Sequence, residues 1–134
     1  MTYRTLLVIK AVVCLFFGVF ILAAPGLLFR LLGGELNAVG RFTAREYGAA
    51  MIGTLLLTWL AKDVLAADAR RAILIDLLVY DAIGVVISVA AVLSGVLGTL
   101  GWGVVVVYLF FAVGSAYVLL ARGSSAASPG RSAA

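Results

Sequence analysis

The chain has 134 residues, of which 65% are hydrophobic and 12% charged, with a net charge of +4. This composition excludes an ordinary soluble domain and predicts a single membrane domain. Histidine is absent and cysteine occurs once, which removes the commonest metal ligand and any internal disulfide. Basic residues lie at the ends of apolar segments, where they set membrane topology. We expect no metal, no cofactor, no catalytic centre and no nucleic-acid partner.

The first apolar run covers residues 6–24 and follows Arg4. It predicts a transmembrane helix that ends before Pro25, because proline cannot continue a hydrogen-bonded turn. A cleaved signal peptide is the alternative. Lys10 interrupts the apolar region, however, and residues 21–23 are a poor small-x-small cleavage site. We therefore favour a retained helix.

After a short interfacial turn predicted at residues 27–32, the second transmembrane helix is predicted at 44–61. Thr43 and Glu46 have the spacing of a capping box, in which a hydroxyl and a carboxylate satisfy free N–H groups at a helix start. This assigns both residues to the helix cap. The alternative for Glu46 is an outer gate residue that pairs with Arg41.

Small and polar residues gather on one side of this second helix. At about 100° per residue, Ala50, Gly53 and Thr58 share one arc, whereas Leu55 and Trp59 lie opposite. Small residues let helix backbones approach closely in a bilayer. The pattern predicts that the helix packs through its Gly53 side.

The third helix, predicted at residues 70–93, carries two acids in an apolar segment. Asp76, Tyr80, Asp81 and Ser88 fall within an arc of about 140°, and apolar residues fill the remainder. A protein-facing side and a lipid-facing side explain this division. The sequence therefore predicts that both carboxylates are buried.

Asp81 lies about 16 Å along this helix from its basic start, near the bilayer midplane. An ionised aspartate there costs about 2.5–3.5 kcal/mol, so it must take up a proton or find a partner. One hypothesis is a polar clamp that bonds to Ser88, Ser115 or a backbone carbonyl. The other is a role in binding an ion, a proton or a ligand. Both stay open.

Asp76 lies about 9 Å from the same end of the helix, and Lys10 lies about as far past Arg4 on the first helix. The equal depth predicts a buried Lys10–Asp76 pair that pins the first helix against the third. Snorkelling of both side chains to the interface is the alternative.

The fourth transmembrane helix is predicted at residues 100–121, after an uncharged hairpin at 94–98. Short connections predict an all-α, up-down-up-down bundle over residues 1–121. The distribution of lysine and arginine places both termini in the cytoplasm. Residues 122–134 are small and polar, which predicts a disordered tail.

Two segments carry a family resemblance. Residues 23–28 read AAPGLL, and residues 45–53 read REYGAAMIG. The pairing resembles small bacterial four-helix membrane proteins of unknown function, the DoxX-like group. The resemblance implies a four-helix bundle and no established activity, and a bacterial inner membrane is the expected location.

The expected function is non-enzymatic, because no nucleophile–base pair is evident. Several small-residue faces predict an interaction or accessory subunit of a larger membrane complex, or a homo-oligomer. Its expected partners are membrane lipids and other transmembrane helices. The alternative is a small transporter, channel or lipid-binding protein that uses Asp81 and Asp76.

Overall fold

The computed structural model describes residues 1–126, with side chains through residue 121, and every regular element within them is a helix. The helices are α1 (Tyr3–Ala23), α2 (Pro25–Leu31), α3 (Ala38–Ala61), α4 (Ala67–Leu93) and α5 (Gly101–Ala126). The predicted all-α class is confirmed for this part of the chain. α5 continues five residues beyond the predicted end at 121, and residues 127–134 of the predicted tail lie outside the described residues.

Three of the helices, α1, α4 and α5, are long and apolar enough to cross a membrane. Their outer surfaces are rich in large apolar side chains, among them Phe16, Val86 and Leu120. Such a surface suits lipid and not water, so this is a membrane protein. α3 is also long, but Arg45 and Glu46 lower the hydropathy of its first half.

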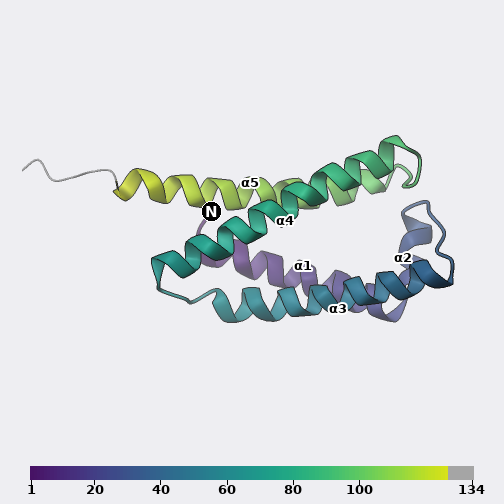
Figure 1. Ribbon diagram of the computed structural model, residues 1–134, viewed down its shortest axis with the longest axis horizontal. Helices are drawn as coiled ribbons and strands as arrows, with labels where there is room; N and C mark the ends of the chain where they lie inside the picture. Colours follow the sequence, from purple (N-terminus) through teal and green to yellow (C-terminus); the bar gives the residue numbers. More distant parts are fainter. Residues whose placement is uncertain (127–134) are drawn as a thin grey trace, which may run out of the picture.

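The long helices form two antiparallel hairpins. α1 packs on α3, and α4 packs on α5, with the short α2 turning the chain between α1 and α3 (Figure 1). The N-terminus and the α3–α4 connection lie at one end of the molecule. α2 and the α4–α5 connection lie at the other end.

Close approach of two glycines holds the first hairpin together. A Cβ on Gly48 would lie 3.1 Å from the Leu22 nitrogen and 3.2 Å from the carbonyl oxygen of Gly18, so a side chain there would push the two backbones apart. At the other end of the hairpin, the Tyr3 hydroxyl donates to the Ala61 carbonyl at 3.0 Å. The buried face of α3 therefore contains Gly48 and Ala61. The predicted packing through Gly53 is wrong, because Gly48 is the glycine that meets a glycine of α1.

The start of α3 also differs from the prediction. The helix begins at Ala38, where Asn37 is the N-cap and its Oδ1 accepts from the Gly40 N–H at 2.7 Å. Thr43 lies inside the helix and donates to the Val39 carbonyl at 3.1 Å, and Glu46 is exposed two turns from the cap. The predicted Thr43–Glu46 capping box is wrong because asparagine caps first and the threonine hydroxyl bonds back to its own helix.

The main core joins the two hairpins through α1. Its fully buried members come from three helices, namely Leu6 and Leu7 of α1, Leu74 of α4 and Phe111 of α5. α3 contributes Ala61 to this cluster and otherwise lies at the periphery, against α1.

At the opposite end, the connections touch each other. The Gly98 N–H donates to the Leu32 carbonyl at 2.7 Å, which ties the α4–α5 connection to the end of α2. Gly33 follows with φ of +88°, and a Cβ there would lie 2.8 Å from the Gly98 nitrogen. Only glycine combines that conformation with so close a contact.

Candidate functional site

A buried ion pair lies where the two hairpins meet. Lys10 projects from α1 and Asp81 from α4, and Nζ donates to Oδ1. The exposed fractions of the two side chains are 5% and 0%. Asp81 is therefore buried, as predicted, and its counter-charge comes from the other hairpin of the same chain.

Aromatic rings cover the lysine. Its Nζ lies 4.3 Å from the centroid of the Phe111 ring and 5.4 Å from that of Tyr80. A cation over an aromatic face gains an attraction that increases as water is removed. Lys10 is thus stabilised by a carboxylate and by two rings, one from α4 and one from α5.

The pair leaves part of its hydrogen-bonding capacity unused. Asp81 Oδ2 and the Ser115 hydroxyl are both fully buried, and neither has a hydrogen-bond partner among the described residues. Ser88 is also buried on α4. The serine partners predicted for Asp81 do not bond to it, and the partner that it has is Lys10.

Asp76 does not belong to this site. It lies on the exposed side of α4, so the predicted burial of both acids and the predicted Lys10–Asp76 pair are wrong. Five residues on a helix correspond to about 140° of rotation. The buried face of α4 contains Leu74, Leu77, Asp81 and Ser88 and is too narrow to include both carboxylates.

Three tyrosines form a second polar contact between the hairpins. The hydroxyl of Tyr47 on α3 lies 2.6 Å from that of Tyr80 on α4 and 2.6 Å from that of Tyr108 on α5. The Tyr108 ring occupies the space that a side chain at Gly84 would fill. Sequence reasoning found Tyr80 but missed Tyr47 and Tyr108, because nothing in their spacing shows that three helices bring them together.

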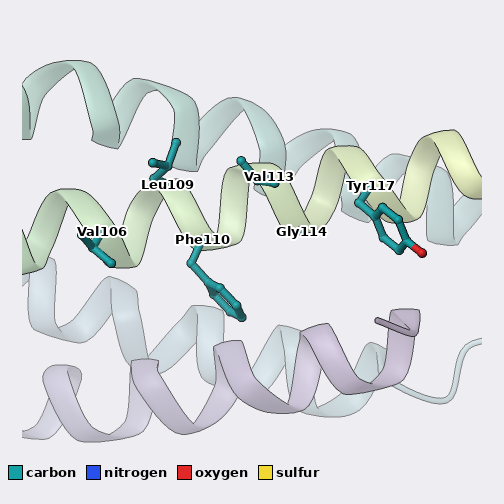
Figure 2. A pocket seen from close by; sticks show the side chains of 6 residues that line it. All are labelled: Val106, Leu109, Phe110, Val113, Gly114 and Tyr117. Carbon is teal, nitrogen blue, oxygen red and sulfur yellow. The ribbon is translucent and has the colours of Figure 1, made fainter.

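Surface hollows lie away from the ion pair. One is a shallow apolar strip on α5 (Figure 2), lined by Val106, Leu109, Phe110, Val113, Gly114 and Tyr117. Another lies near the start of the chain and is lined by Thr2, Tyr3, Arg4, Lys62, Asp63, Leu65 and Arg70. Neither contains Lys10 or Asp81. Lys10 and Asp81 point to each other, so the ion-pair site can hold the helices in register.

The outer face of α3 is open. A Cβ placed on Gly53 would meet no atom within 4 Å, and Ala49 and Ala50 are exposed beside it. Arg45 and Glu46 lie on the same face, and neither belongs to an ion pair within the part of the chain that the structure describes. The alternative pairing of Glu46 with Arg41 is likewise not formed. Leu57 and Leu60 are also exposed on this side of the helix. This face therefore presents small residues, large apolar residues and two charges that form no ion pair within the described residues.

The described residues offer few groups for thiol or metal chemistry. Cys14 is buried, and the described residues contain no group of three or more His, Cys, Asp or Glu that could hold a metal ion. Comparison of the chain with family models, curated proteins and solved structures gave no match in any of the three. The resemblance to the DoxX-like group stays a prediction.

Proposed function

We propose that this protein is a non-enzymatic membrane subunit that associates with a second copy of itself through the outer face of α3. The observation that carries the proposal is the open surface at Gly53, flanked by two charges without partners. In a bilayer, small residues permit close helix contact, and dispersion between backbones drives association. Packing of α3 against α3 of a second copy would cover this surface.

The proposal treats α3 as a fourth membrane-crossing helix, with both termini in the cytoplasm of a bacterial cell. The support is its position: it lies alongside α1, from the Gly18–Gly48 contact to the Tyr3–Ala61 hydrogen bond. Since α1 is long and apolar enough to cross, its antiparallel neighbour occupies the same depth. Arg45 and Glu46 then lie near one interface.

The two charges favour a second copy as the partner. Two copies with the same orientation in the membrane place α3 parallel to α3, related by a two-fold axis. Arg45 of each copy then lies at the depth of Glu46 of the other. The face is therefore complementary to itself in charge, and the small residues at Ala49, Ala50 and Gly53 lie near the axis.

The oligomeric state in mild detergent tests the proposal. We expect a dimer by native mass spectrometry, and we expect Gly53→Leu to shift it to monomer without loss of folded protein. Val86→Leu on the exposed side of α4 is the matched control and should leave the dimer intact. A monomeric wild-type protein, or a different chain bound in stoichiometric amount, would overturn self-association.

A second candidate function is a small transporter or channel that uses Asp81. The observation in its favour is the pair of unpartnered buried groups, Asp81 Oδ2 and the Ser115 hydroxyl. Reconstituted protein would then conduct protons or a solute, and Asp81→Asn would abolish the flux. Flux unchanged in that variant would remove this candidate. Asp76 is not part of it, because that side chain is exposed.

A further inference from the structure

The hollow near the start of the chain gathers cations. Arg4 on α1, Lys62 at the end of α3 and Arg70 on α4 line it together with one acid, Asp63. We propose that it binds the phosphate group of an anionic phospholipid. This site goes beyond the proposed self-association and uses none of its residues.

The geometry holds the cations in place. Arg70 donates from Nε to the Val64 carbonyl, and its guanidinium carbon lies 5.0 Å from the centroid of the Tyr3 ring. Lys62 donates to the Trp59 carbonyl at 3.1 Å and lies 4.2 Å from the centroid of the Trp59 ring. Because both side chains are already ordered, an anion bound beside them costs little further conformational entropy.

The charge balance favours an anion. Arg4 and Lys62 lie 3.1 Å and 3.3 Å from the Asp63 carboxylate, which neutralises one of the three positive charges. Two remain uncompensated in the hollow. Arginine and lysine are the side chains that bind phosphate oxygens.

The location favours a lipid as the source of the phosphate. The hollow opens at the end of the membrane-crossing helices, where headgroups lie. Leu65, 85% exposed, lies on its rim and gives an acyl chain an apolar contact next to the cations. Basic pockets between transmembrane helices recognise anionic headgroups in this way.

Native mass spectrometry of the purified protein, titrated separately with phosphatidylglycerol and phosphatidylcholine, tests the site. We expect the anionic lipid to bind more tightly, and Arg4→Gln to weaken its binding about five-fold. Asp63→Asn should strengthen binding by a similar factor, because it removes the competing carboxylate. Arg41→Gln, which removes a charge at the opposite end of the molecule, should change nothing.

Three results would overturn the proposal. The first is equal binding of the two lipids, and the second is an Asp63→Asn variant that binds like the wild type. The third concerns the source of the phosphate: soluble glycerol 3-phosphate that binds as tightly as the lipid would show a free-phosphate site. Each readout is taken on the monomer and the dimer separately, so failure of self-association does not affect the test.

Discussion

Two sets of opposite charges lie among the apolar helices of this protein, and the chain treats them differently. Lys10 and Asp81 come from different hairpins, lie in the core and neutralise each other. Arg45 and Glu46 are neighbours on the outer face of α3 and have no ion-pair partner within the described residues. The first set is satisfied inside one copy of the chain, whereas the second requires something outside it.

This difference separates folding from association. Charged groups in a membrane are costly unless paired. Lys10 and Asp81 meet that requirement when the hairpins dock, so substitutions there should change the stability of the fold. Arg45 and Glu46 can be solvated by snorkelling or can pair with a second copy, so substitutions there should change the oligomeric state. Substitutions at the two places should therefore affect different measurements.

The largest expected effect is that of Lys10→Ala. It leaves Asp81 buried without its counter-charge, and the loss of one partner of such a pair costs about 3–5 kcal/mol of unfolding free energy. Reversible unfolding in mixed micelles measures this loss of unfolding free energy. The double variant Lys10→Met/Asp81→Leu replaces both charges with apolar side chains and should recover most of the stability that a single change loses. Equal, independent losses from the two single changes would show that the pair does not couple the hairpins.

The two glycines of α3 give the next comparison. Gly48→Leu forces apart α1 and α3 where two glycines meet and should cost about 1–3 kcal/mol of unfolding free energy. Gly53→Leu meets open space and should cost nothing in the monomer. The same unfolding measurement distinguishes them. Equal destabilisation by both changes would contradict the assignment of buried and open faces.

A smaller effect is expected at the tyrosine cluster. Tyr47→Phe keeps the ring but removes the hydroxyl that contacts Tyr80 and Tyr108. Interhelical hydrogen bonds in membranes contribute about 0.6 kcal/mol each, so the variant should lose about 1 kcal/mol of unfolding free energy. A loss as large as that of Lys10→Ala would make the tyrosines, and not the ion pair, the main polar contact between the hairpins.

The smallest effect is expected for Asp76→Asn. Its side chain is exposed on α4, and substitutions at such positions change the unfolding free energy by less than about 0.5 kcal/mol. A cost comparable to that of Asp81→Asn would show that both acids face the protein interior.

The sequence predicted the long helices and the burial of Asp81, because apolar length and one central acid are local signals. The partner of Asp81 could not be predicted. Depth along the helices suggested Asp76 for Lys10, but the angular position of each acid on α4 decided the pairing. The side of α3 that packs on α1 was also predicted wrongly, because the contact at Gly48 depends on Gly18, which belongs to another helix.

The proposed association is tested most directly by exchanging charges at Arg45 and Glu46. We expect Arg45→Glu to leave two acids on each copy at the contact and Glu46→Arg to leave two cations on each copy, so each variant alone should be monomeric. Mixed together, they present opposite charges, and native mass spectrometry should detect only heterodimers. Variants that remain dimeric alone, or a mixture that stays monomeric, would contradict association through this face of α3.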